Sequence, residues 1–243
     1  MGDLSRCSHS ECKTDGVTTD SARQAAVDTA LRLIRPGATM GFGSGRAVFA
    51  LVDALGLRPT EAKAMRAVVA SEVTGQRAIK AGIQVVDLNE VSSVDIAFDG
   101  ADEVDPQMRL IKGGGAALLR EKIVLRAANQ VIIMAEAGKQ VERLGQGRDL
   151  PVEIVRFGWK TTEQRVSSLA GGARLRCTPE QTPVITDEGH YLLDVPLPEQ
   201  DLTNFATELK QVVGVVEHGL FLDEADKIIL GETDGSSRTL TRN

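Results

Sequence analysis

Short apolar runs alternate with segments of helical periodicity through roughly the first half of the chain. The runs contain few polar residues, so strands formed from them need to be covered on both faces. Such strands alternating with helices are typical of a parallel sheet between two helical layers. The sequence therefore predicts an α/β fold with a Rossmann-like parallel sheet and helices on both faces. The expected strands are residues 38–42, 65–70, 83–88, 94–98 and 131–135.

The helices of this sheet are predicted from apolar residues spaced three and four apart. The first should begin at a cap formed by Asp20 or Ser21 and end at Pro36-Gly37, a dipeptide that stops helices. The segment before it is rich in Ser, Thr and Asp and has no apolar period, so residues 1–19 are predicted to be a disordered leader. Further helices are expected at residues 47–55, 76–81 and 116–128.

The pattern changes after Leu150-Pro151, and a second unit is predicted there. A hairpin over residues 184–195 turns on Asp187-Glu188-Gly189, and the order of elements fits a split βαβ arrangement. We expect a small α+β, ferredoxin-like domain at residues 150–223, and a Rossmann-like domain at 20–149 and 224–243 that regains a strand at 227–230. The other strands expected in the small domain are 152–155, 173–176 and 215–222, and its helices are 162–169 and 202–213.

Charge and composition exclude several classes of function. The 243 residues carry a net charge of −6, whereas a general nucleic-acid surface needs a basic face. No apolar run approaches the length of a membrane span, and charged residues interrupt the N-terminus where a signal peptide would be apolar. We therefore expect a cytoplasmic protein without nucleic-acid or membrane partners.

The cysteines give no disulfide framework, because there are three and two of them lie in the leader. The tract from Cys7 through His9 to Cys12 can be interpreted as a metal site, but its spacing matches no standard zinc pattern. An unstructured polar leader is the preferred interpretation.

A glycine loop, with Gly41, Gly43 and Gly45 followed by Arg46, lies between an expected strand and an expected helix. Small residues at a helix N-terminus let backbone N–H groups meet an anion, and a guanidinium adds a planar cation suited to phosphate. The alternative is a tight turn that needs glycine for its backbone angles. Dinucleotide binding fits less well, because the third glycine comes too early for that fingerprint.

Asp99 and Asp102 follow the strand that ends at Phe98. Ligands of parallel sheets bind outside the carboxyl ends of strands, so both carboxylates are expected to face a cleft. Two alternatives remain open at this point: a solvated acidic turn, and a magnesium cluster formed with Glu103 and Asp105.

Glu121 is a carboxylate on an apolar stripe, because its helical neighbours at three and four positions are Ala117, Leu118, Val124 and Leu125. Desolvation there favours the protonated form and raises basicity, which suits a general base. The alternative is a glutamate that pairs with a buried lysine. Lys112, at the start of the Gly113–Gly115 loop, can be that partner or can stabilise developing negative charge.

The three histidines lie far apart in the sequence, and no His-x-His or His-x-x-x-His pair exists. A metal-assisted hydride shift needs a dedicated site of histidine and carboxylate ligands, so we expect no metal. His190 and His218 are interpreted as surface or satisfied core positions.

With these motifs identified, residues 20–235 resemble a type A ribose-5-phosphate isomerase. The most specific segments are Asp99-Gly-Ala-Asp102-Glu103 and Lys112-Gly-Gly-Gly-Ala-Ala-Leu-Leu-Arg120-Glu121-Lys122. Supporting segments begin at Asp87, Gly138, Leu150 and Val213.

The resemblance implies interconversion of D-ribose 5-phosphate and D-ribulose 5-phosphate through an enediol, without metal or organic cofactor, by a homodimer or homotetramer. It implies that Glu121 is the base, that Asp99 and Asp102 handle hydroxyl protons, and that Lys112 and the backbone after it stabilise the enediolate. The substrate-binding residues that it implies are Ser44, Gly45, Arg46, Ala47, Gly100, Ala101, Gly113, Gly114, Gly115 and Lys139, with Arg23 in place of a phosphate-binding lysine.

The phosphate loop departs from the family pattern, because Gly43-Ser44-Gly45-Arg46-Ala47 stands where the family has Gly-Thr-Gly-Ser-Thr. One hydroxyl is kept, and a guanidinium and a methyl replace the other two, so positive charge increases. A non-catalytic phosphosugar sensor is the alternative function. It predicts loss of the acids or the base, whereas Asp99, Asp102, Lys112 and Glu121 are all present. An amino-sugar phosphate deaminase or an acyl-CoA transferase is a third alternative; the deaminase would need a histidine near its acids.

Overall fold

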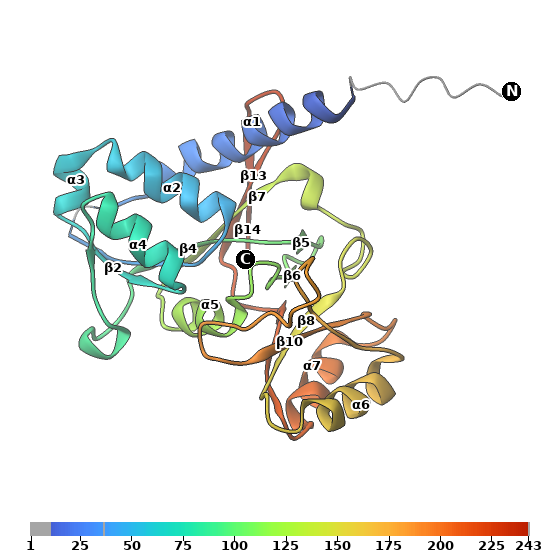
Figure 1. The fold of residues 1–243 in the computed structure, drawn as a ribbon. Helices are drawn as coiled ribbons and strands as arrows, with labels where there is room; N and C mark the ends of the chain where they lie inside the picture. Colours follow the sequence, from blue (N-terminus) through green and yellow to red (C-terminus); the bar gives the residue numbers. More distant parts are fainter. Residues whose placement is uncertain (1–10, 36, 243) are drawn as a thin grey trace, which may run out of the picture.

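A computed structural model describes residues 11–35 and 37–242, and its largest element is a seven-stranded sheet (Figure 1). The strand order is β14-β13-β7-β4-β1-β2-β3, with every neighbouring pair parallel except β13 and β14. This order is doubly wound: successive strands step outward from β1 in one direction and then, from β4, in the other. The predicted α/β fold class is confirmed. The strands are β1 (Thr39–Phe42), β2 (Arg66–Val69), β3 (Gln84–Val85), β4 (Ile96–Gly100), β7 (Val131–Glu136), β13 (Lys227–Gly231) and β14 (Ser237–Thr241).

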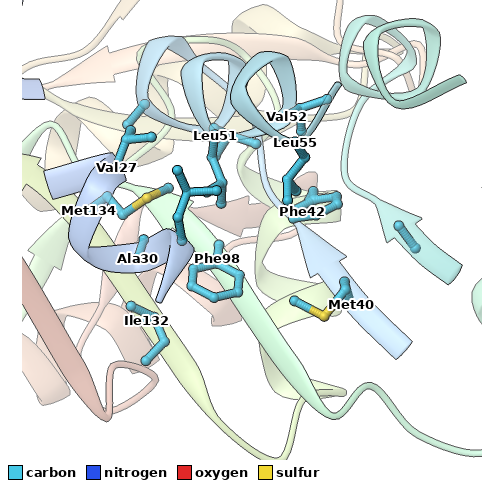
Figure 2. Packing of buried hydrophobic residues seen from close by; sticks show 14 of the residues in the cluster. Val27, Ala30, Met40, Phe42, Leu51, Val52, Leu55, Phe98, Ile132 and Met134 are labelled. Atoms are coloured by element: carbon cyan, nitrogen blue, oxygen red, sulfur yellow. The ribbon is translucent and has the colours of Figure 1, made fainter. Parts of the chain in front are cut away.

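Helices cover both faces of this sheet (Figure 1). On one face, α1 (Glu11–Leu31), α2 (Arg46–Gly56), α3 (Pro59–Lys63) and α4 (Glu72–Lys80) enclose a core in which Phe42 and Phe98 are fully buried (Figure 2). Each such side chain contributes about 1.5–3 kcal/mol by leaving water. On the other face α5 (Leu118–Arg126) packs Val124 and Leu125 against the strands.

Helix α1 begins earlier than the sequence predicts. It starts at Glu11 instead of at an Asp20 or Ser21 cap, so part of the expected disordered leader is helical, and residues 1–10 lie outside the described residues. The helix lies directly on β13, where a Cβ atom at Gly231 would be 1.8 Å from the carbonyl oxygen of Ala22. This tertiary contact holds the second half of the helix on the sheet.

The segment after residue 150 forms its own four-stranded antiparallel sheet, in the order β11-β8-β10-β9. Strands β8 and β9 are joined by α6 and separated by β10, which is the predicted split βαβ arrangement. The expected domain boundaries at residues 150 and 223 stay a prediction. The elements are β8 (Leu150–Ile154), α6 (Trp159–Ala170), β9 (Arg174–Leu175), β10 (Tyr191–Val195), α7 (Leu202–Gln211) and β11 (Val215–His218).

A third, small sheet connects the two parts and was not predicted. It contains β5 (Glu103–Val104), β6 (Leu110–Ile111) and β12 (Leu220–Phe221). The single strand expected at residues 215–222 is therefore wrong: it divides at Gly219 into β11 and β12, which belong to different sheets. Gly219 also donates its N–H to Pro151 O at 2.7 Å and accepts from Lys112 N at 2.9 Å, so the break holds the two parts together.

Among the described residues, no helix is long and apolar enough to cross a membrane.

Candidate active site

The glycine loop connects β1 to α2 at the point where the strand order reverses, which is where ligands bind in doubly wound sheets. Gly45 caps α2 with φ +97° and provides no side-chain cap, so the first N–H groups of the helix are open to an anion. Gly43 lies against Asp99: a Cβ atom at position 43 would be 1.9 Å from the Asp99 carboxyl carbon. Ser44 N–H donates to Asp99 Oδ1 at 3.3 Å, so the loop is fixed to β4.

Lys112 lies between two carboxylates at the buried end of the site. Its Nζ is 2.9 Å from Asp99 Oδ2 and 3.0 Å from Glu121 Oε2, and it donates to Gly100 O at 2.8 Å. All three side chains are at most 5% exposed. The two interpretations of Glu121, as a base and as the partner of a buried lysine, are therefore compatible.

The charges of this cluster do not balance, because two carboxylates share one ammonium. Burial and the neighbouring Asp99 raise the pKa of Glu121 to about 8, although Lys112 opposes the shift. Burial also raises the pKa of Asp99, against the effect of Lys112. Burial alone would lower the pKa of Lys112, but Asp99 and Glu121 outweigh burial and raise it, so this side chain stays an ammonium. Glu121 is thus a carboxyl group that exchanges its proton near neutral pH.

A cavity of about 690 Å³ opens in front of this cluster. Its wall contains the end of the glycine loop from Ser44 onward, together with Asp102, Lys112 and Glu121, and all but two of the predicted site residues. Asp99 and Arg23 are the two exceptions. The predicted residues that line the cavity are Ser44, Gly45, Arg46, Ala47, Gly100, Ala101, Asp102, Lys112, Gly113, Gly114, Gly115, Glu121 and Lys139.

Asp99 lies behind Lys112. Its carboxylate was expected to face the cleft, and it does not. It is inside β4, where alternate side chains point to opposite faces, and its carboxylate points to the face covered by α5. It is 0% exposed and therefore acts on the cavity through Lys112.

Arg23 also lies away from the expected position. Its Nε donates to Glu136 Oε1 at 2.8 Å, and Lys139 Nζ is 2.9 Å from the other oxygen of Glu136. Lys139 also donates to Ala101 O at 2.6 Å and lines the cavity. Arg23 thus contacts Glu136, which holds Lys139. Arg46 and Lys139 are the basic residues of the cavity beside the glycine loop.

The carboxylates that could form the alternative magnesium cluster are each bound to a different partner. Asp102 Oδ2 accepts from Gly114 N at 2.8 Å, and Glu103 accepts from the N–H groups of Gly145 and Gly147, each at 2.6 Å. Asp105 binds the backbone and side chain of Arg109. Within residues 11–242, position 36 aside, no group of three histidine, cysteine or carboxylate side chains is placed to hold a metal ion. Cys7 and His9 lie outside the described residues.

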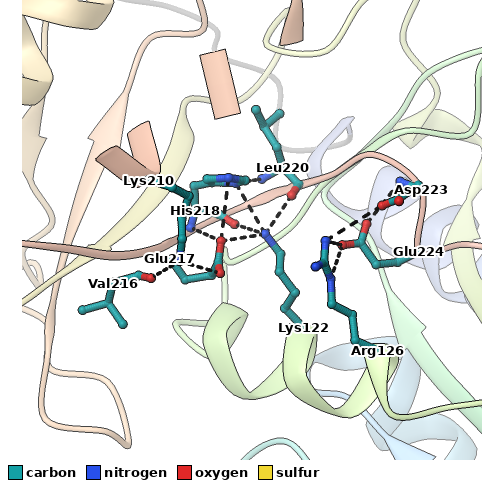
Figure 3. Close-up of polar contacts among 9 residues, drawn as sticks. All are labelled: Lys122, Arg126, Lys210, Val216, Glu217, His218, Leu220, Asp223 and Glu224. Atoms are coloured by element: carbon teal, nitrogen blue, oxygen red, sulfur yellow. Dashed lines mark hydrogen bonds and ion pairs between the residues drawn. The ribbon is translucent and has the colours of Figure 1, made fainter. Parts of the chain in front are cut away.

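Lys122, the residue after Glu121 on α5, contacts the turn around Gly219 (Figure 3). Its buried ammonium donates to His218 O at 2.7 Å, Leu220 O at 2.9 Å and Glu217 Oε1 at 2.9 Å. These bonds fix the turn around Gly219, whose carbonyl accepts from the backbone N–H of Lys112. His218 is 5% exposed and hydrogen-bonded, so the prediction of a satisfied core histidine is confirmed.

The sequence analysis missed the cavity residues that lie in the small domain and in the segment just before it. These residues come from β8, β9, β10 and the segments beside them, far along the chain from the glycine loop. No local motif marks them, because their role depends on how the two sheets pack. They are Gly147, Arg148, Asp149, Pro151, Arg174, Arg176 and Asp194.

Comparison with known proteins places the chain in a family. A family model described as ribose 5-phosphate isomerase A (phosphoriboisomerase A) matches residues 66–235. The chain is 43% identical over 219 residues to ribose-5-phosphate isomerase A of Synechococcus sp. (strain JA-3-3Ab), covering 89% of this chain and 95% of that protein. It is 40% identical over 228 residues to the protein of the same name from Caulobacter vibrioides (strain NA1000 / CB15N), covering 91% and 99%.

Solved structures give the same result. Ribose 5-phosphate isomerase A from Methanocaldococcus jannaschii has a TM-score of 0.85 and 32% identity, covering 92% of this chain and 99% of that one. A D-ribose-5-phosphate isomerase in complex with phospho-erythronic acid has a TM-score of 0.87 at the same identity and coverage. The chain therefore belongs to the ribose 5-phosphate isomerase A family.

Proposed function

We propose that this chain interconverts D-ribose 5-phosphate and D-ribulose 5-phosphate by moving a proton between C1 and C2 through an enediol. The observation that carries the proposal is the position of Glu121. Its carboxyl group lines the cavity, is 3.0 Å from Lys112 Nζ, and has a pKa raised to about 8. A base with a pKa near the working pH is suited to remove a weakly acidic carbon-bound proton and to return it.

Lys112 and the backbone after it act as the electrophilic side of the site. Proton removal from C2 places negative charge on the carbonyl oxygen, and a buried ammonium stabilises that charge strongly because water is excluded. Asp99, behind Lys112, keeps the ammonium charged and in position. Asp102 faces the cavity and is the carboxylate that handles hydroxyl protons during ring opening.

The glycine loop binds the phosphate in this proposal. The open N–H groups of α2, the hydroxyl of Ser44 and the guanidinium of Arg46 surround one end of the cavity, and Lys139 adds a second cation. Phosphate binding at this end directs the sugar carbons toward Glu121.

A solved relative binds phospho-erythronic acid, which carries a phosphate and a carboxylate on a four-carbon chain. We expect the same compound to compete with ribose 5-phosphate here, with its phosphate at Gly43–Ala47 and its carboxylate toward Lys112. We also propose that the enzyme works in the cytoplasm as a homodimer or homotetramer, as the family resemblance implies. Light scattering after gel filtration measures the assembly.

The test is isomerisation of ribose 5-phosphate in deuterium oxide, followed by NMR. We expect ribulose 5-phosphate to form and solvent deuterium to enter the carbon that receives the proton. Binding of ribose 5-phosphate without any turnover would instead support the phosphosugar sensor. Turnover that depends on an added divalent ion would contradict the proton-transfer scheme.

A further inference from the structure

A single peptide of the loop after Lys112 is bound on both of its edges. Arg176 Nη1 donates to Gly113 O at 2.7 Å, and Gly114 N–H donates to Asp102 Oδ2 at 2.8 Å. These two groups belong to the same peptide unit, and a trans peptide points its C=O and its N–H in opposite directions. Arg176 and Asp102 therefore fix the orientation of this peptide from opposite sides.

The next peptide is oriented in the same sense. Arg176 Nη1 also lies 3.4 Å from Gly114 O, so the N–H of Gly115 points away from the guanidinium. Gly115 lines the cavity, and across the described residues its N–H has no protein acceptor. Because Gly115 lines the cavity, this N–H is available as a donor to an oxygen of the substrate.

The loop has one turn hydrogen bond of its own, from Ala116 N–H to Gly113 O at 3.1 Å, and its strained backbone angles call for support from outside as well. Gly113 has φ +109°, and Ala116, which is not a glycine, has φ +61°. A positive φ in a residue with a Cβ atom is disfavoured and persists only where surrounding contacts impose it. A Cβ atom at Gly113 would also be 2.8 Å from Leu118 Cδ2, so the loop has little free space on that side.

Arg176 is itself held rigidly by a carboxylate. Its Nε donates to Asp194 Oδ1 at 3.0 Å, and its Nη2 pairs with the same carboxylate. The side chains of Arg176 and Asp194 are 17% and 18% exposed. Arg176 directly follows β9, and Asp194 lies in β10, the strand that pairs with β9. A planar guanidinium can bind a carboxylate with one edge and a carbonyl with the other, whereas a lysine ammonium has no such fork.

We propose that Arg176, held by Asp194, is a positioning residue that orients the Gly113–Gly115 peptides so that the Gly115 N–H stabilises the enediolate oxygen. The proposal rests on the isomerase function proposed above. The small domain then has a part in catalysis, because it supplies the Arg176 guanidinium that sets the direction of the backbone donors. Arg176 acts through the loop and does not react with the substrate.

The test measures kcat and KM for ribose 5-phosphate in Arg176→Ala, with Arg126→Ala as the control. Arg126 pairs with Glu224 on the outer side of α5, away from the cavity, so its loss should leave both constants unchanged. Misplacing a catalytic group by about 1 Å costs up to about a hundredfold, so we expect kcat of Arg176→Ala to fall by about tenfold to a hundredfold. KM and inhibition by inorganic phosphate should stay close to wild type, because the glycine loop is untouched.

Chemical rescue separates positioning from loss of stability. Guanidinium chloride, below the concentration that unfolds the protein, should restore part of the kcat of Arg176→Ala, and methylammonium should not. A variant that is merely unstable would lose more activity in guanidinium. Wild-type kcat in Arg176→Ala, or equal failure of both cations to rescue, would overturn the proposal.

Two further variants decide the question if Arg176→Ala does not fold. Arg176→Lys keeps the charge but lacks the fork, and Asp194→Asn keeps the shape but loosens the guanidinium. Both should fold and should lose kcat with little change in KM, and wild-type kcat in both would refute the positioning role. Wild-type enzyme assayed in parallel shows whether the isomerase function itself holds. Failure of the proposed function can thus be distinguished from failure of the positioning role.

Discussion

Lys112 Nζ lies 3.0 Å from Glu121 Oε2, in a cluster where burial and Asp99 raise the pKa of Glu121 to about 8 and Lys112 opposes that shift. The ammonium therefore has two effects on catalysis. It stabilises negative charge on the substrate, and it keeps the glutamate acidic enough to be ionised in an appreciable fraction of molecules at neutral pH.

The pH dependence of kcat/KM should report this balance. The base has to be ionised, so activity should rise with pH and level off above the pKa of Glu121, about 8. Lys112→Met removes the charge that lowers this pKa, so the rising limb should move to higher pH while the plateau falls. Lys139→Met is the matched control, because Lys139 lines the same cavity without contacting Glu121; it should raise KM and leave the limb in place. An unshifted limb in Lys112→Met would contradict the role given to the contact.

Glu121→Gln keeps the shape of the side chain and removes the base. A positioned general base contributes about two to four orders of magnitude, so kcat should fall at least about a hundredfold. Deuterium incorporation from solvent should disappear in parallel, while phospho-erythronic acid should still bind. A folded variant with more than about a tenth of wild-type kcat would be incompatible with this role, and Asp102, the other carboxylate in the cavity wall, would become the candidate base.

Activity should survive dialysis against a strong chelator. The place between Asp99 and Glu121 that a cation could occupy already holds the Lys112 ammonium, and Asp102, Glu103 and Asp105 are bound to backbone N–H groups. The rate before and after dialysis, with and without added magnesium, is the measurement. A loss that magnesium restores would show that an essential ion binds elsewhere.

The three residues of the buried cluster can be singled out from the sequence, because they lie within one short segment; their catalytic roles stay a prediction. Asp99 directly follows an expected strand, Glu121 is a carboxylate on an apolar stripe, and Lys112 lies between them. What the sequence could not provide is the direction of each side chain. The two-residue period of a strand sends Asp99 behind Lys112, and a one-residue shift in the register of the strand would reverse that result.

Long-range pairing explains the other differences. Arg176 and Asp194 lie in the small domain, and only the pairing of β9 with β10 and the packing of both against the Gly113 loop bring them into the site. The break at Gly219 has the same origin: its N–H and C=O bind Pro151 and Lys112, so the chain leaves one sheet and enters another. An apolar run alone indicates a strand and does not indicate which sheet it joins.

Arg46→Ala should raise KM for ribose 5-phosphate much more than it lowers kcat. Arg46 is exposed at the start of α2, lines the cavity, and has no ion-pair partner in the part of the chain that the structure describes, so its charge is available to a phosphate. Loss of an interaction that is equally strong in the bound substrate and in the transition state has this kinetic signature. Arg23→Met should have a smaller effect, because Arg23 binds Glu136 and lies outside the cavity wall. Equal KM values in Arg46→Ala and wild type would place the phosphate elsewhere.

The Lys122 network predicts how stability depends on acid. Burial and the charge of Lys122 lower the pKa of His218 to about 3, from 6.5 in the unfolded chain, and Glu217 and Lys210 are the other charged groups beside the ring (Figure 3). Between these values the unfolded chain binds a proton that the folded protein does not. His218 therefore contributes stability that is complete above about pH 6.5 and is lost progressively as pH falls toward about 3.

Glu217 acts in the same direction at lower pH. Although its own burial works the other way, Lys122 and the His218 N–H lower its pKa from 4.5 to about 2, so its contribution is lost only below about pH 4.5. Between about pH 6.5 and 4.5, His218 is the member of this network that titrates, with a slope of up to about 1.4 kcal/mol per pH unit. Urea unfolding across this range should show the free energy of unfolding falling with pH in the wild type and falling less steeply in His218→Asn. The same slope in both proteins would mean that His218 is protonated in the folded state, and that Lys122 does not lower its pKa.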